Sequence, residues 1–227
     1  MTTSERLRQK LAFALPSFAD VAWRMWDSPN VAPLYQEYLC TMHCIVRSSV
    51  PLMETAIARA HELESDPVAA GVAAYLESHV DEERGHDEWV LQDLAATGFD
   101  RDEPLRRIPP PAVAAVVGSQ YYWIRHHHPV ALLGHIAVVE GYPPSVSLAK
   151  TLEERTGFGP DAFRSLARHS MLDIHHRDEF LDALDALSLR REHEEIVGVS
   201  ALHTVRGLIE IFDYILERDS APTSVPA

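Results

Sequence analysis

The segment from residue 166 to residue 187, LARHSMLDIHHRDEFLDALDAL, decides the fold class. Successive residues of an α-helix are rotated by about 100° about its axis. On this projection Leu166, Phe180 and Leu184 fall on one face, with Asp173 near its centre. An apolar stripe of this period is typical of a helix that packs on a core. We therefore predict a helix here, with a carboxylate on its buried face.

Two histidines share that face with Asp173. His169 precedes it by four residues and His176 follows it by three, whereas His175 points the opposite way. An ionised carboxylate in the core costs several kcal/mol unless it is paired or coordinated. A metal ion would supply the missing charge. A hydrogen-bonded Asp–His pair in the core is the alternative without a metal.

Helical patterns dominate the rest of the chain, and no segment alternates polar and apolar residues as a half-buried strand does. Proline and glycine mark the boundaries between helices. We predict an all-α, single-domain bundle of about seven to eight helices over residues 1–219, followed by a disordered tail at 220–227. The expected helices span 4–26, 32–64 with a kink at Pro51, 66–96, 112–127, 129–141, 144–155, 161–188 and 191–218.

The composition excludes some classes of function. The chain has 34 Asp and Glu against 20 Lys and Arg, a net charge of −14, together with 13 His. Nucleic acids and anionic membranes bind basic patches, so we expect neither as a partner. No apolar stretch reaches the ~18 residues of a membrane span. Cys40 and Cys44 are four residues apart, a spacing that we interpret as two buried, reduced thiols in a cytoplasmic protein.

The expected helix 66–96 carries a second group of ligand-type residues. Glu83 lies at the centre of its apolar stripe, and His86 lies about 60° away from that centre. Glu-x-x-His is the pair that chelates metal in carboxylate-bridged diiron bundles. His79 lies two turns before His86 and is a further ligand, a group behind the ligands or a surface residue.

The third group is a single carboxylate. Glu140 ends a segment that is apolar on nearly all sides, while His135 lies on the far side of the same helix. A buried Glu needs a cation or a hydrogen-bond donor, and an arginine is the alternative to a metal. Three carboxylates and three imidazoles suit iron or manganese better than structural zinc. The predicted ligands are Glu83, His86, Glu140, His169, Asp173 and His176, with His79 as a seventh candidate.

The order of these motifs resembles the haem-oxygenase-like diiron oxidases, a family of iron-containing redox enzymes. The pattern Tyr75-Leu-x2-His79-x2-Glu82-Glu83-x-Gly85-His86-x2-Trp89 and the segment His128-Pro129-x-Ala131-x-Leu133-Gly134 before Glu140 are similar to that family as well. The similarity covers roughly residues 30–190. Some members have a carboxylate ligand where this chain has His79, and others have one where it has Glu83.

The resemblance implies a compact helical bundle that binds two iron ions per chain, Fe(II) or Fe(III), with manganese as an alternative. It implies that O2 and a small metabolite are the substrates. The metabolite would be an amino acid or another carboxylic acid in a biosynthetic pathway. The reaction would be N-hydroxylation, oxidative C–C cleavage, decarboxylation or desaturation, with the metal ligands as the catalytic residues. A single ion, an external electron donor and a homodimer are further expectations.

Three residues outside the ligand set are candidates for substrate binding. His43 and Arg47 lie one turn apart, and Arg47 would clamp a substrate carboxylate with two parallel hydrogen bonds. A surface arginine is the alternative for Arg47. Tyr122 would wall a pocket together with Tyr121 and Trp123, although core packing is the favoured explanation for at least two of these three residues.

Other classes of protein remain open. A metal-independent enzyme on the same scaffold, of the thiaminase-II type, needs a cysteine nucleophile near its pocket; a cofactor-free oxidase needs none. A ferritin-like bundle needs two Glu-x-x-His motifs, but the second motif here is Asp173-x-x-His176. A metal-free helical binding protein would leave Asp173 and Glu140 buried without a cation.

Overall fold

The computed structural model describes residues 1–142 and 144–219, apart from the side chains of residue 146 and residues 171–176. Asp173 and His176 therefore lie outside the described side chains, and the predicted tail at 220–227 lies outside the described residues. The helices are α1 (Thr3–Trp26), α2 (Val31–Val46), α3 (Ser49–Glu62), α4 (Pro67–Glu83), α5 (His86–Ala96), α6 (Glu103–Arg106), α7 (Pro111–His126), α8 (Ala131–Val139), α9 (Val146–Thr156), α10 (Arg164–Ala186) and α11 (Arg191–Asp219), with a 3-10 helix η1 (Pro160–Phe163) before α10.

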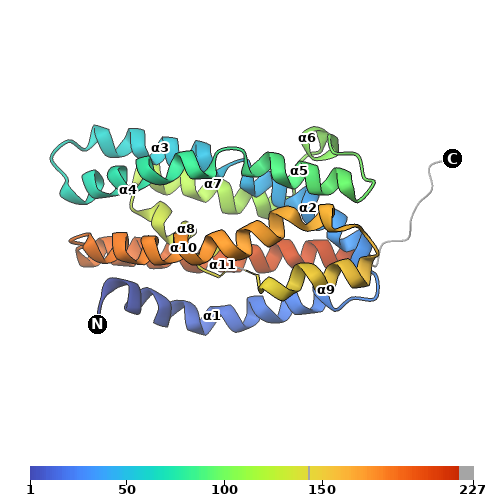
Figure 1. Ribbon diagram of the computed structural model, residues 1–227. Helices are drawn as coiled ribbons and strands as arrows, with labels where there is room; N and C mark the ends of the chain where they lie inside the picture. Colours follow the sequence, from blue (N-terminus) through green and yellow to red (C-terminus); the bar gives the residue numbers. More distant parts are fainter. Residues whose placement is uncertain (143, 220–227) are drawn as a thin grey trace.

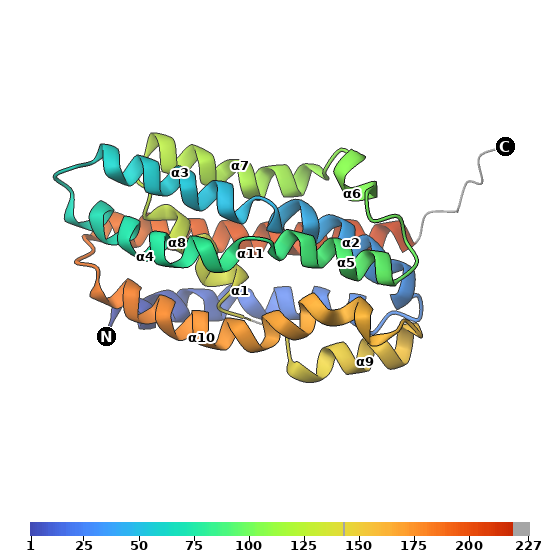
Figure 2. The same cartoon turned by 45° about the horizontal axis from the view of Figure 1, so that its top comes forward.

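The helices run side by side in one bundle, which confirms the predicted all-α class (Figure 1). The long helix α11 lies inside this bundle and packs against α1, α2, α7 and α8. In Figure 1, α3, α4 and α7 lie above α11, and α1 lies below it. Figure 2 shows the same order from a second direction, with α5 continuing the line of α4. Within the described residues, no helix is both long and apolar enough to cross a bilayer.

The expected helix 32–64 is two helices. Helix α2 ends at Val46 and α3 begins at Ser49, so the break falls at Arg47 and Ser48 rather than at Pro51. A proline in the first turn of a helix gives up no hydrogen bond, because the N–H groups of that turn have no partner within the helix. Pro51 therefore fits inside the start of α3 without kinking it.

The expected helix 66–96 is also two helices. Its start is as predicted, because the Asp66 side chain accepts hydrogen bonds from the N–H groups of Val68 and Ala69 at 2.8 and 3.2 Å. It stops at Glu83, and α5 begins at His86. Between them, Gly85 has φ +86°, a left-handed conformation that glycine adopts without the steric cost of a side chain.

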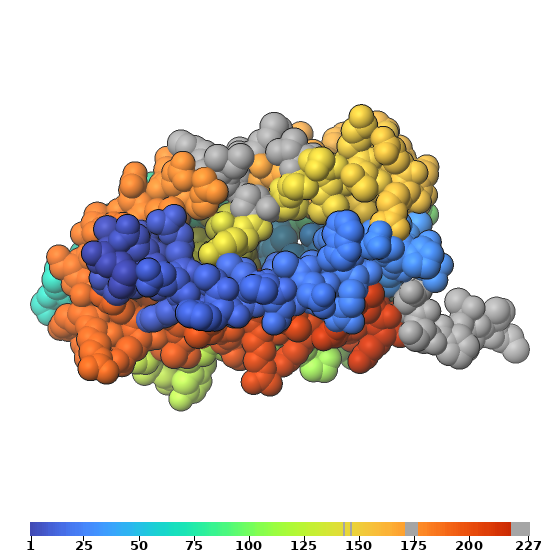
Figure 3. All heavy atoms as spheres, turned by 90° about the horizontal axis from the view of Figure 1, so that it is seen from below, coloured from blue at the N-terminus to red at the C-terminus, as the bar shows by residue number. Residues whose placement is uncertain are grey.

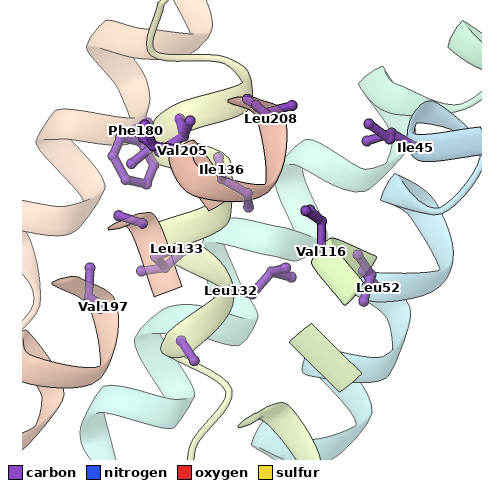
Figure 4. Close-up of a cluster of buried hydrophobic side chains, with 14 of the residues drawn as sticks. Ile45, Leu52, Val116, Leu132, Leu133, Ile136, Phe180, Val197, Val205 and Leu208 are labelled. Carbon is purple, nitrogen blue, oxygen red and sulfur yellow. The ribbon is translucent and has the colours of Figure 1, made fainter. Parts of the chain in front are cut away.

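Helix α8 lies at the centre of the core. All of its residues from Ala131 to Val138 are buried, as its apolar sequence predicts. It approaches α11 so closely at Gly134 that a Cβ atom there would collide with the backbone of Val197. The core around α8 includes Leu52, Val116, Leu132, Leu133, Ile136, Phe180, Val197, Val205 and Leu208 (Figure 4). Packing of this kind holds α8, and the residues that follow it, in one position.

Candidate metal centre

The end of α8 brings Glu140 to α4. Glu140 follows the last residue of α8 and is 8% exposed, and His79 of α4 is 3% exposed. Nε2 of His79 lies 2.9 Å from Oε2 of Glu140. One ligand-type atom each from His79, Glu83 and Glu140 lie within 4.8 Å of one another. Three of the seven predicted ligands thus gather at one buried point.

His86 and His169 continue this group. The turn at Gly85 leads the chain back so that Nδ1 of His86 lies 3.3 Å from Oε2 of Glu83. The ring of His86 meets the ring of His169 edge to face, with 5.1 Å between centroids. On its other side His86 stacks on Trp89 at 4.1 Å. The predicted Glu-x-x-His pair therefore meets across a break between two helices, and not on one helical face.

Nearby carboxylates control the protonation of His79. Burial by itself would lower the pKa of His79, but the hydrogen bond and charge of Glu140 outweigh burial and raise this pKa to about 9. Nδ1 of His79 lies 3.2 Å from Oε2 of Glu82. Since carboxylate oxygens accept hydrogen bonds, His79 carries a proton on both nitrogens near neutral pH. Burial would raise the pKa of Glu83, yet the adjacent His86 and His79 lower it.

The hydrogen bonds of His169 and His79 test whether this donor set suits a metal. Histidines that bind metals usually donate their other ring N–H to a carbonyl or a carboxylate. Nδ1 of His169 donates to the carbonyl oxygen of Ser165 at 2.8 Å, so Nε2 is the nitrogen that could bind a metal. In His79, the Nδ1 proton is directed to Glu82, and the Nε2 proton toward Glu140 is the one that a metal ion would replace. The residues present fit a metal.

His86 supports the same conclusion. Its Nδ1 is buried and makes no hydrogen bond in the part of the chain that the structure describes, although it faces Glu83. A buried polar atom without a hydrogen bond is uncommon and costs free energy. A metal ion bound between Glu83 and His86 would satisfy this atom. Asp173 and His176 follow His169 along α10, and their role as ligands stays a prediction because their side chains are not described.

A cavity of about 140 Å³ adjoins the group. Glu83, Glu140 and His169 form part of its wall, and most of the remaining wall is apolar. The other described residues that line it are Tyr38, Leu39, Met42, Ile45, Val46, Ser49, Val90, His135, Val139, Pro144, Ser165 and Leu166. Seen from below, the molecular surface is hollowed between α1 and α9, next to the end of α8 (Figure 3). The group of ligand-type residues thus has space for a small molecule beside it.

A second cavity, of about 610 Å³, lies between α4 and α10. His79 and Glu82 belong to its wall, as does Tyr75, whose ring stacks on His79 with 5.5 Å between centroids. Burial raises the pKa of Tyr75 well above the usual range, so its hydroxyl keeps its proton. His79 therefore separates this cavity from Glu140.

The predicted substrate-binding residues lie elsewhere. His43 is buried and Arg47 is half-buried, but neither is among the described residues that line the smaller cavity, although their neighbours Met42 and Val46 are. Tyr122 is 62% exposed and packs against the ring of His126 on α7. Their roles in substrate binding stay predictions, since none of the three is among the described residues that line this cavity.

His135 lines the cavity and was not among the predicted site residues. The helical projection places it on the side of α8 away from Glu140. The signal was present in the apolar sequence of α8, since a helix that is buried all round buries its polar residues too.

A second group of ligand-type residues, formed by Asp66, His128 and His193, lies away from the cavity, near the starts of α4, α8 and α11. Nδ1 of His128 accepts a hydrogen bond from the N–H of Val130 at 3.1 Å, so the proton of a neutral ring is on Nε2, which faces Asp66 at 3.5 Å. Both nitrogens of His193 face N–H groups of Arg190. These contacts join the starts of α4, α8 and α11.

Comparison with known proteins assigns the chain to a family. The model of the iron-containing redox enzyme family matches residues 36–206, and the chain belongs to that family. No curated protein matches the chain. The predicted haem-oxygenase-like fold is confirmed by a domain of unknown function with a heme oxygenase-like fold from Shewanella denitrificans OS217, which is 20% identical over 98% of this chain and 97% of that one, with a TM-score of 0.82.

Two further solved structures share the fold. A TenA homolog from Pseudomonas syringae pv. tomato DC3000 is 12% identical over 92% of each chain, with a TM-score of 0.69. A CADD-like protein of unknown function from Nostoc punctiforme PCC 73102 is 16% identical over 95% of this chain and 96% of that one, also with a TM-score of 0.69. At these identities the similarity establishes the fold alone, and the reaction has to be inferred from the residues of the site.

Proposed function

We propose that the protein is a non-haem diiron oxidase or oxygenase that uses O2 to oxidise a small metabolite. The observation that carries this proposal is the buried group of Glu140, His79, Glu83, His86 and His169 beside the 140 Å³ cavity. Membership of the iron-containing redox enzyme family supports it. The reaction is an N-hydroxylation, oxidative C–C cleavage, decarboxylation or desaturation, and an external donor supplies any electrons that the metabolite does not.

Two iron ions would be held by seven side chains. His79, Glu83 and Glu140 would form one part of the site, His86 and His169 would continue it, and Asp173 and His176 of α10 would be the remaining ligands. Iron with oxygen and nitrogen ligands supplies the redox chemistry and the open coordination positions that O2 activation needs. The mixed set of carboxylates and imidazoles also accepts manganese.

The remaining residues bind and enclose the substrate. The apolar wall of the cavity excludes water and favours the hydrocarbon part of a metabolite. No Lys or Arg is among the described residues that line this cavity, so the proposed metabolite does not depend on an arginine clamp such as the one predicted at Arg47. An amino acid or another carboxylic acid remains the class of substrate that the family resemblance implies.

A cysteine-dependent reaction on the same scaffold finds less support. Cys40 and Cys44 are buried, and the thiol of Cys44 donates to the carbonyl oxygen of Cys40 at 3.4 Å. Burial raises the pKa of both thiols. A nucleophilic cysteine needs a low pKa and access to its substrate, and these two thiols have neither.

A metal-free role is the second alternative, because a protonated His79 satisfies Glu140 without an ion. Measurement of iron uptake distinguishes a metal-free role from the proposed diiron enzyme. Chelated full-length protein, titrated with Fe(II) without O2, is expected to bind about two ions per chain by metal analysis, and a variant with His169, Asp173 and His176 all replaced by Ala is expected to lose most of this uptake. His61→Gln is the matched control, because His61 is an exposed histidine that also pairs with a glutamate, Glu77. Unchanged uptake in the triple variant would show the proposal to be wrong.

A further inference from the structure

His135 lies on α8 directly after Gly134, where α8 touches α11. It is 4% exposed, and it lines the 140 Å³ cavity together with Glu83, Glu140 and His169. The proposed metal centre does not use it. A histidine in such a place is either paired within the core or available to whatever occupies the cavity, and its hydrogen bonds distinguish these two cases.

The hydrogen bonds of Thr204 determine which nitrogen of His135 carries the proton. The hydroxyl of Thr204 donates its hydrogen to the carbonyl oxygen of Ser200 at 2.9 Å. Its oxygen, 3.1 Å from Nδ1 of His135, can then only accept. Nδ1 of His135 must therefore be the donor, and in a neutral ring the lone pair is on Nε2.

The ring is neutral near pH 7. Burial, with a smaller contribution from the nearby His203, lowers the pKa of His135 to about 4. No carboxylate forms an ion pair with His135 in the described part of the chain. Nε2 makes no hydrogen bond there either, so a bare acceptor remains on a ring that borders the cavity.

We propose that Nε2 of His135 binds the substrate by accepting a hydrogen bond from an N–H or O–H group of that molecule. A neutral acceptor in an apolar wall selects for a donor and against an oxygen that can only accept, because burial would leave two facing lone pairs unsatisfied. The substrate class is thus an apolar molecule with an amine, amide or hydroxyl donor. This deepens the proposed function, on which it rests only for the identity of the cavity as the substrate site.

The first test is the protonation of the ring, which needs no ligand. In full-length protein labelled with 15N-histidine, His135 is identified as the signal lost in His135→Asn. We expect Nδ1 to have the 15N shift of a protonated nitrogen and Nε2 that of an unprotonated one from pH 6 to pH 8. The reverse assignment would overturn the proposal.

The second test compares two probes of equal composition, 1-butanol, which has a donor, and diethyl ether, which has none. By chemical-shift titration of chelated full-length protein, we expect 1-butanol to bind about tenfold more tightly than the ether, the range for one buried hydrogen bond. His135→Asn can place its amide N–H near Thr204 but has no atom at the position of Nε2, and should bring the ratio close to one. His135→Phe, which keeps a ring and removes both nitrogens, is the second variant if Asn at this position prevents folding.

His61→Asn is the matched control, since it makes the same change at an exposed histidine, and it should keep the wild-type ratio. An unchanged preference for 1-butanol in both His135 variants would refute the proposal. The probes are titrated into chelated protein and iron uptake is measured separately, so the two proposals can fail independently. If wild type shows no preference for 1-butanol but takes up iron normally, only the role of His135 is refuted. If wild type prefers 1-butanol but does not take up iron, only the metal centre is refuted.

Discussion

The imidazole of His79 and the carboxylate of Glu140 meet at 2.9 Å, and this contact joins α4 to the end of α8. The two residues are 61 positions apart in the chain, and both are buried. In the metal-free protein the contact is a hydrogen bond between a cation and an anion. A metal ion bound between them would take the place of the shared proton, so acid and metal compete for the same position.

The first prediction concerns stability with and without iron. A ligand that binds only the folded state stabilises it by about 2.7 kcal/mol at a hundredfold excess over its dissociation constant, which for a chain of this length corresponds to a melting temperature higher by about 5–10 °C. We expect Fe(II) to produce such a rise under anaerobic conditions and a chelator to reverse it. Differential scanning calorimetry would show the change. A Glu140→Gln variant that still gives the full rise would contradict Glu140 as a ligand.

The second prediction is a pH dependence of the chelated protein. The pKa of His79 is raised from an ordinary value of 6.5 to about 9. The folded state therefore holds this proton more tightly than the unfolded state does, and its contribution to stability is complete below pH 6.5 and is lost as the pH rises to about 9. Urea unfolding of wild type and of His79→Gln at pH 6.5 and pH 9 measures it. We expect the free energy of unfolding to fall between pH 6.5 and pH 9 in wild type and to fall less in the variant. An equal fall in both proteins would exclude His79 as the cause.

The third prediction concerns the turn between α4 and α5. Gly85 has φ +86°, where an L-residue costs about 1–2 kcal/mol. Gly85→Ala should lower the free energy of unfolding by about that amount and reduce iron uptake, because His86 follows the turn. Gly118→Ala is the control: Gly118 lies inside α7 with open space around a new Cβ, and the substitution should stabilise by up to about 1 kcal/mol. Iron uptake equal in the two variants would contradict a role of the turn in placing His86.

The fourth prediction concerns the thiols. Since Cys40 and Cys44 are buried and their pKa values are raised, native protein should react with a disulfide reagent far more slowly than unfolded protein, which should yield two thiols per chain. Replacing both cysteines by Ala should leave iron uptake unchanged. Fast reaction of a thiol in the native protein, or loss of iron uptake in the double variant, would revive the cysteine-dependent alternative.

The sequence predicts the fold class well because helical periodicity is a local property, and the Asp66 cap and the buried helix α8 appear where the sequence places them. Breaks within helices are harder to predict. The pattern over 66–96 predicts one helix, but Arg84 is extended and Gly85 is left-handed, and together they separate α4 from α5. Glu83 and His86 still meet, because the turn between them returns the second residue to the first.

Contacts between helices that lie far apart in the sequence could not be predicted from the sequence. The choice between ligand and surface for His79 stayed open, since only the position of α8 determines whether Glu140 reaches it. The same reason applies to Arg47, which follows the end of α2, and to Tyr122 on α7, since neither is among the described residues that line the cavity. His135 was missed because a projection of one helix does not show what lies on its other side.

The close approach of α8 to α11 has a consequence for how this protein tolerates sequence change. Gly134 has no space for a side chain; His135 follows it in the same short helix, and Glu140 directly follows the end of that helix. A methyl group at residue 134 would push the whole of α8 outward and carry both residues with it. A variant at residue 134 would thus have the phenotype of a lost metal ligand and a lost substrate contact, although neither residue had been altered.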